Sequence, residues 1–407
     1  MSILSPLVKA AEAVNKLNAN YTSISYEELK AMTFMQRVRA YNWTFELGAV
    51  AVLGLVLVFY LVGTKLNTSR AEKLFDSVSQ CFHDLAFARV GFSTKSGDKK
   101  KYISEHNNTW FTTFTTGRST IKYITVRSHM YARFNPMAMI TERVLGVFFP
   151  SLIERDLQEY VEVVVAPNGI YVPNELAEVP ANANEALSKF KFIASIVNKG
   201  DMGKAREQNY FLSLTHTAES ENLPLQYVFM SENNQLNGFF SRYGGAEFRT
   251  LLEKCANILS YISFTDLPDE KPITDKLWNE NQEPRCVIRC KLSTNSRDLT
   301  NLNELIKSVV GIYDSVTQEF LETPASAFIT NDMLKKSYNL RTQELQKIQK
   351  VMKQVERELA MEKKQKLEKE KRRELRNKLS GEEQDKLDRK MKEKRERRMR
   401  NRQKTRM

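Results

Sequence analysis

An uncharged apolar stretch near the N-terminus constrains this chain more than any other feature. Leu47–Gly63 reads LGAVAVLGLVLVFYLVG, and its neighbours extend it to about the twenty residues that cross the hydrocarbon core of a bilayer. Trp43 and Tyr60 lie where interfacial aromatic side chains are expected. A buried core helix is the alternative, but uniform apolarity between polar flanks favours a membrane span. The sequence therefore predicts a transmembrane helix over residues 43–64.

The last 77 residues carry all of the chain's excess positive charge. Residues 331–407 hold 28 Lys and Arg against 14 Asp and Glu, whereas the preceding 330 residues hold 34 against 35. No proline interrupts this tail, and Ser380-Gly381-Glu382-Glu383 has the spacing of a capping box. We therefore expect two helices, over residues 332–379 and from Gly381 onward. At 1.5 Å per residue the first would be about 70 Å long.

The tail combines a short apolar seam with a long charged continuation. The seam has heptad spacing and predicts about two heptads of coiled coil, through Leu345, Ile348, Met352, Val355 and Leu359. Beyond it, oppositely charged residues four apart favour a solvated helix. Lys390–Met407 then holds ten basic residues against two acidic ones. Such a run predicts a polyanionic partner, either RNA phosphates or anionic lipid headgroups, although a solvated helix without a partner is the alternative.

The candidate RNA-binding residues are basic side chains of the distal tail. They are Arg372, Arg373, Arg376, Lys378, Arg389, Lys390, Lys392, Lys394, Arg395, Arg397, Arg398, Arg400 and Arg402.

The orientation of the apolar stretch follows from indirect arguments. The flanking basic residues balance, with three on each side: Lys30, Arg37 and Arg39 before it, and Lys65, Arg70 and Lys73 after it. A polyanionic partner for the tail and a reducing pool for sparse cysteines are both found in the cytosol. We therefore expect a lumenal segment over residues 1–42 and a cytosolic C-terminus. Asn20, in Asn20-Tyr21-Thr22, is then a glycosylation acceptor.

Between the apolar stretch and the tail, residues 70–321 predict a single α+β domain. An amphipathic helix over residues 70–88 comes first, and Trp110–Phe134 reads as a strand hairpin. Met137–Phe149 is apolar on more than one face, and core packing is favoured over a membrane or partner-helix surface. Further strands are expected at residues 157–165, 190–197, 210–215, 226–230, 261–265 and 285–292, and further helices at residues 246–259 and 299–320.

The residues of this domain show no catalytic pattern. Phosphate-binding, dinucleotide-binding, nucleophile-elbow and zinc-protease motifs are absent from the sequence. The four histidines lie far apart, and the cysteines have neither a redox nor a zinc spacing: Cys81, Cys255, Cys286 and Cys290. We expect buried, reduced thiols, no metal site, no cofactor and no enzymatic activity.

The chain resembles the calumin family of coiled-coil endoplasmic-reticulum proteins, which pair with Asterix in the PAT complex. The resemblance covers roughly Phe75 to the C-terminus. It is carried by the charged tail and by four segments: Phe134–Pro136, Leu251–Asp266, Cys286–Leu292 and Leu299–Val316. The resemblance implies an intramembrane chaperone subunit that assists multipass client membrane proteins beside the ribosome-bound Sec translocon and other multipass translocon subunits. The implied partners are an Asterix-like small membrane protein and, through the tail, ribosomal RNA.

The front of the chain departs from the animal members of this family. We expect no cleavable signal here. A long acidic region is not seen, because residues 1–45 hold only Glu12, Glu27 and Glu28 as acids. Calcium buffering, which the family's acidic region implies, is therefore not expected here. Two alternatives to the chaperone hypothesis remain. One is a membrane tether whose tail binds anionic lipid on an apposed bilayer, and the other is a membrane-anchored enzyme.

Overall fold

The computed structural model describes residues 18–93, 99–105, 108–148, 158–172, 183–245, 247–324 and 327–378, together with residues 16, 386, 389, 392, 393, 396 and 397. The chain divides into two compact units. The first comprises residues 1–269 and 283–334, and the second comprises residues 270–282 and 335–407.

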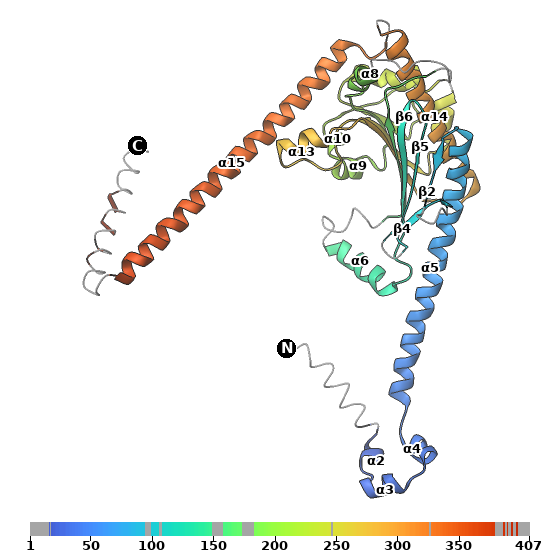
Figure 1. The fold of residues 1–407 in the computed structure, drawn as a ribbon, viewed down its shortest axis with the longest axis vertical. Coiled ribbons are helices and arrows are strands. Elements are labelled where there is room, and N and C mark those ends of the chain that lie inside the picture. The colour runs from blue at the N-terminus through green and yellow to red at the C-terminus, as the bar shows by residue number, and fades with distance from the viewer. Residues whose placement is uncertain are drawn as a thin grey trace. The chain divides into compact units, whose positions relative to one another are not determined.

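One helix, α5 (Thr44–Asp84), joins the apolar stretch to the folded part of the first unit, which we call the body (Figure 1). The sequence predicted two helices here, but no proline or cap lies between them, and Thr68 donates its hydroxyl to the Thr64 carbonyl within the helix, at 3.0 Å. After Gly63 one face of α5 is buried, at residues that recur every three or four positions: Asn67, Ala71, Leu74 and Val78. The apolar stretch is therefore a direct extension of a core helix.

The body is built on an antiparallel ten-stranded sheet with the order β1-β5-β6-β7-β12-β11-β8-β10-β9, and β4 pairs with β5. Its strands are β1 (Arg89–Val90), β4 (Ile103–Glu105), β5 (Trp110–Thr116), β6 (Ile121–His129), β7 (Tyr160–Pro167), β8 (Ala194–Asn198), β9 (His216–Ala218), β10 (Tyr227–Ser231), β11 (Leu259–Thr265) and β12 (Arg285–Lys291). A separate pair contains β2 (Phe92–Ser93) and β3 (Lys99–Lys100).

The sheet confirms the predicted hairpin and five of the six further strands. In the hairpin, β5 alternates between buried and half-buried residues, whereas β10 is buried along its whole length because both of its faces are covered. The strand predicted at residues 210–215 was wrong, since α10 (Tyr210–Ser213) occupies that position. Phe211 and Leu212 are adjacent and both buried, and a short apolar run of this kind does not distinguish a strand from a helix by periodicity.

Helices cover the sheet and frame its ends. The long α14 (Ser296–Glu322) packs beside the upper half of α5, where the Asn303 side-chain amide donates to the Ser77 hydroxyl at 2.9 Å (Figure 1). Among its described residues, the first unit also contains α2 (Ala19–Thr22), α3 (Tyr26–Ala31), α4 (Phe34–Ala40), α6 (Pro136–Phe148), α8 (Ala183–Ser188), α9 (Met202–Gln208), η1 (Asn234–Asn237), α11 (Gly238–Tyr243) and α12 (Glu247–Lys254).

The four cysteines lie in the core as free, buried thiols, as the sequence predicted. Burial raises the pKa of the Cys81 thiol to about 11 and that of the Cys255 thiol to about 12. Because the thiolate is the reactive form, these side chains are inert packing groups at neutral pH.

The second unit contains α13 (Asp275–Glu280) and the long helix α15 (Asn331–Lys378), most of which belongs to this unit. Helix α15 matches the long helix predicted over residues 332–379. The expected break at Ser380 and Gly381 lies outside the described residues.

Candidate functional site

The part of α5 before Gly63, which we call its lower half, is an exposed apolar helix surface. An 18-residue window in α5 has a mean hydropathy of 2.4, and none of that window is buried. Among the residues that the structure describes, α5 is the helix long and apolar enough to cross a membrane. At 1.5 Å per residue the whole helix is about 60 Å long, roughly twice the hydrocarbon thickness of a bilayer. Half of the helix can therefore span a membrane while the other half packs in the body.

Gly63 lies at the boundary between these two halves. A Cβ atom at this position would lie 2.4 Å from the backbone carbonyl carbon of Arg133, so only glycine lets the chain after β6 approach the helix this closely. One turn earlier, the Tyr60 ring meets the Phe134 ring edge to face, with centroids 6.2 Å apart. The chain's own backbone therefore occupies the space beside Gly63 that a partner helix could otherwise approach. By contrast, Gly48 and Gly54 have nothing within 4 Å.

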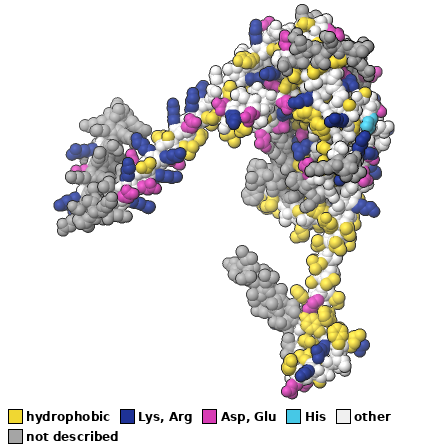
Figure 2. All heavy atoms as spheres, in the orientation of Figure 1, with side chains coloured by type: hydrophobic (Ala, Val, Ile, Leu, Met, Phe, Trp, Pro, Cys, Tyr) yellow, Lys and Arg dark blue, Asp and Glu magenta, His cyan; other side chains and the backbone are white. Residues whose placement is uncertain are grey.

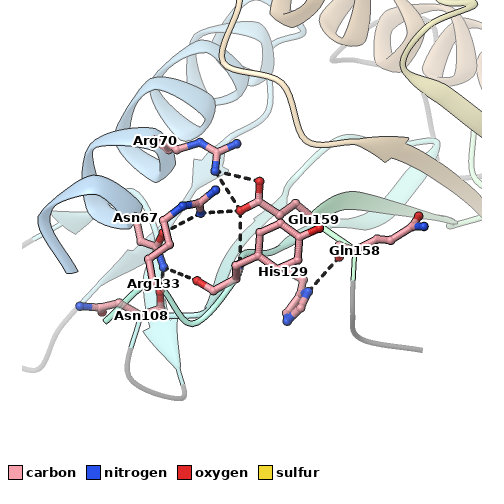
Figure 3. Close-up of polar contacts among 8 residues, drawn as sticks. Asn67, Arg70, Asn108, His129, Arg133, Gln158 and Glu159 are labelled. Carbon is pink, nitrogen blue, oxygen red and sulfur yellow. Dashed lines mark hydrogen bonds and ion pairs between the residues drawn. The ribbon is translucent and has the colours of Figure 1, made fainter. Parts of the chain in front are cut away.

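A polar network fixes this junction just inside the body (Figure 3). The Glu159 carboxylate receives two hydrogen bonds from Arg70 at 2.9 Å, one from Arg133, and one from the Tyr131 backbone N–H at 3.2 Å. The Asn67 amide donates to the carbonyls of Asn108 and Tyr131, at 3.0 and 2.9 Å, and accepts from Arg133. The network therefore ties α5 to the segments that flank β5, β6 and β7 at one end of these strands.

The charge of Glu159 is stabilised inside this network. Burial opposes ionisation, but hydrogen bonds from Arg133 and Arg70, together with the positive charge of Arg70, outweigh it and hold the pKa of Glu159 below its usual value. A carboxylate that is ionised and fully engaged in this way serves to hold structure. It is not available as a general acid or base.

Helix α6 carries a second exposed apolar surface next to α5. Its side chains at Met137, Val147 and Phe148 are 66, 79 and 71% exposed, although the sequence predicted that this segment packs in the core. That expectation was wrong, because no part of the chain that the structure describes covers the apolar stripe of α6. Figure 2 shows hydrophobic side chains along the lower part of α5 and on the adjoining underside of the body. The helical spacing of Met137, Ile140 and Val144 was the sequence signal for this surface.

The predicted coiled-coil seam is only partly exposed on α15. Ile348 is 4% exposed, whereas Val355 and Leu359 are 48 and 51% exposed. The residues buried at the start of the helix form a different stripe, through Ser337, Arg341, Glu344 and Ile348. This stripe shares only Ile348 with the predicted seam and includes two charged side chains, so burial at the start of α15 does not follow the predicted heptad. Pairing of two chains through the distal seam stays a prediction.

The candidate RNA-binding residues lie partly within α15. Arg372, Arg373, Arg376 and Lys378 belong to the last two turns of that helix, and Arg373 is exposed. Exposed helical positions are also described for Arg389, Lys392 and Arg397. The others lie outside the described residues: Lys390, Lys394, Arg395, Arg398, Arg400 and Arg402.

Before the other end of α5, Asn20 is an exposed residue of α2, and its glycosylation stays a prediction. Asn67, which also begins an Asn-x-Ser sequence, is buried with its amide engaged in the network above.

Where residues are described, no cluster of three or more His, Cys, Asp or Glu side chains is arranged to hold a metal ion.

Comparison with known proteins identifies relatives along almost the whole chain. The family model of the PAT complex subunit CCDC47 matches residues 42–398. A UPF0674 endoplasmic reticulum membrane protein of Saccharomyces cerevisiae is 50% identical over 360 residues, which are 88% of each chain. A UPF0674 endoplasmic reticulum membrane protein of Schizosaccharomyces pombe is 24% identical over 290 residues, 71% of this chain and 72% of that one.

Proposed function

Because this chain belongs to the family of the PAT complex subunit CCDC47, we propose that it is a non-enzymatic subunit of an intramembrane chaperone complex in the endoplasmic reticulum. In this proposal it assists the insertion and folding of multipass membrane proteins at the ribosome-bound Sec translocon. The observation that carries the proposal is the extent of the family match, which includes the apolar half of α5, the body and most of the basic tail. The printed names of both fungal relatives, which are endoplasmic reticulum membrane proteins, support the location.

In this proposal, two apolar surfaces of the chain contact the membrane or a partner within it. The lower half of α5 offers an uncharged helix to a partner in the bilayer, and α6 offers an apolar face next to it at the underside of the body. Leu47–Gly63 contains no charged side chain, so the chain itself has nothing there to pair with the polar groups of a client. A partner such as an Asterix-like small membrane protein would meet those groups, while α5 and α6 hold that partner beside the translocon.

In this proposal, the basic tail binds the ribosome. With residues 1–42 in the lumen and the chain after Thr64 in the cytosol, the basic residues after Arg372 reach ribosomal RNA. The exposed positions at Arg373, Arg389, Lys392 and Arg397 suit such a contact, because phosphate binding requires accessible cations and reads no particular sequence.

Ribosome co-sedimentation from microsomes at increasing salt tests this proposal. If the tail neutralises about six phosphates, binding weakens by roughly four to five decades per decade of salt. A variant in which glutamine replaces Arg389, Lys390, Lys392, Lys394 and Arg395 should leave the ribosome at lower salt and with a flatter slope. A matched control places the same five glutamines in α15, at Lys363, Lys364, Lys366, Lys369 and Lys371. The control should keep the steep slope and membrane insertion.

Two outcomes contradict the ribosome contact. One is a distal variant that sediments with ribosomes at every salt concentration as the unchanged chain does. The other is a variant that keeps ribosome binding but loses binding to anionic liposomes, which favours the membrane tether.

A further inference from the structure

A cavity of about 460 Å³ lies where the chain enters α5, in the range typical of small-molecule sites. Three aromatic side chains form part of its lining: Tyr21, Tyr41 and Trp43. Their rings stand edge to face, with Tyr21 and Tyr41 centroids 5.3 Å apart and Tyr41 and Trp43 centroids 5.0 Å apart. Neighbouring rings pack edge against face, and the parts of them that stay uncovered form walls of the cavity. Aromatic walls of this kind recognise quaternary ammonium groups, whose charge is attracted to the ring faces.

Local hydrogen bonds hold these walls in position. The Trp43 indole N–H donates to the Val38 carbonyl at 2.8 Å, and the Asn42 backbone N–H donates to the Asn18 side chain at 2.8 Å. The Tyr41 hydroxyl donates to one carboxylate oxygen of Glu46, and this hydrogen bond raises the pKa of Tyr41 above its usual value. The cavity is therefore preorganised, which lowers the entropy cost of binding a ligand.

The charges that line the cavity have opposite signs and different roles. The second carboxylate oxygen of Glu46 is buried and accepts no hydrogen bond from the residues that the structure describes, so it lacks a compensating partner. The Arg37 guanidinium also lines the cavity and gives one N–H to the Lys30 carbonyl at 3.3 Å. An arginine has five N–H donors, and this bond leaves several of them for an anion. Glu46 thus adds a negative charge beside the cavity that attracts a cation, and Arg37 offers N–H donors to a phosphate.

The depth of the cavity relative to the membrane indicates where such a ligand would come from. Trp43 immediately precedes α5 and Glu46 lies in its first turn, so the cavity opens at the end of the apolar stretch, among the residues that lie at headgroup depth when α5 spans a bilayer. A primary ammonium would need three hydrogen-bond acceptors, whereas a trimethylammonium needs ring faces and one negative charge.

We propose that this cavity binds the phosphocholine headgroup of a bilayer phospholipid. The trimethylammonium group lies against the sides of Tyr41 and Trp43 that line the cavity, close to the charge of Glu46, and the phosphate lies on Arg37. The proposal rests on the span assigned to α5 but not on the ribosome or client roles of the chain.

Calorimetric titration of the full chain in a maltoside detergent tests the site. Dibutyroyl phosphocholine should bind saturably, and dibutyroyl phosphoethanolamine should bind at least about tenfold more weakly. Trp43→Leu and Glu46→Gln should each weaken phosphocholine binding about tenfold or more, whereas Trp43→Phe should retain most of it. Tyr26→Leu is the matched control, because Tyr26 is an exposed aromatic residue outside the cavity lining.

Three results would overturn the site. They are unsaturable binding, equal affinity for the two headgroups, and unchanged affinity in Glu46→Gln and Arg37→Gln. Arg37 is exposed, so its variant remains informative even where Trp43→Leu fails to fold. The source of the ligand is tested by comparing glycerophosphocholine with phosphatidylcholine retained from nanodiscs. Binding of the soluble compound without retained lipid would contradict the phospholipid assignment, and neither outcome depends on ribosome binding.

Discussion

At the scale of single residues, Gly63 decides how closely the body approaches the helix that carries it. A methyl group at this position would lie 2.4 Å from the Arg133 backbone, which cannot move aside as a side-chain tip could. We expect Gly63→Ala to destabilise the body by about 1–3 kcal/mol, the usual cost of overpacking. Thermal unfolding of the full chain in detergent, followed by near-ultraviolet circular dichroism, measures this loss.

Gly54→Ala provides the control for that experiment. Gly54 also lies inside α5 but has nothing within 4 Å, so the added methyl group meets no atom and favours the helix by up to about 1 kcal/mol. Equal unfolding temperatures for the two variants would contradict the close contact at Gly63.

Glu159 gives the junction a dependence on pH. Its pKa is lower in the folded chain than the ordinary value of 4.5, so its stabilisation is fully present above pH 4.5 and is lost as the pH falls through the folded value. Glu159→Gln should cost about 1–3 kcal/mol at neutral pH, because it leaves two arginines without their carboxylate. The difference from the unchanged chain should shrink below pH 4.5. A difference that stays constant in urea unfolding down to acidic pH would show that Glu159 acts through packing alone.

At the scale of elements, α6 should matter for membrane contact and not for folding. Serine at Met137, Ile140 and Val144 should change the stability of the body by less than about 0.5 kcal/mol per site, because these side chains are exposed. In nanodiscs, the backbone amides of α6 in the unchanged chain should exchange more slowly than the amides on the rest of the body's surface. In the serine variant, the α6 amides should show no such protection. Equal protection in both chains would show that α6 meets neither lipid nor a partner through this face.

The elements differ in how far the sequence could predict them. Strands such as β5 were predictable because alternate residues face the core, and α14 because its apolar stripe is long. The continuity of α5 was not, since Thr64–Ser69 is polar and reads as a loop until Asn67 is seen buried in its network. Nor could the exposure of α6 be predicted, because an apolar face looks the same whether protein or membrane covers it. Asn67, Arg133 and Glu159 come together from distant segments, and no local pattern links them.

At the scale of the whole molecule, the two sides of the membrane can be assigned by one experiment. With residues 1–42 in the lumen, translation in the presence of microsomes should add a glycan to Asn20, which is exposed, and Asn20→Gln should remove the corresponding mobility shift. Protease added outside the microsomes should digest the chain after about Lys65. Protection of the C-terminal tail would reverse the orientation and exclude the proposed ribosome contact.

Because α5 is one unbroken helix, the body cannot swivel freely on the bilayer. About 20 residues of the helix lie beyond Gly63, which is a lever arm of roughly 30 Å. A transmembrane helix tilts to match the thickness of the lipid around it. By elementary geometry, a change in tilt of about 10° would sweep the far end of this arm through roughly 5 Å. With α5 as the proposed span, a change in the local thickness of the bilayer would therefore displace the body by several ångströms.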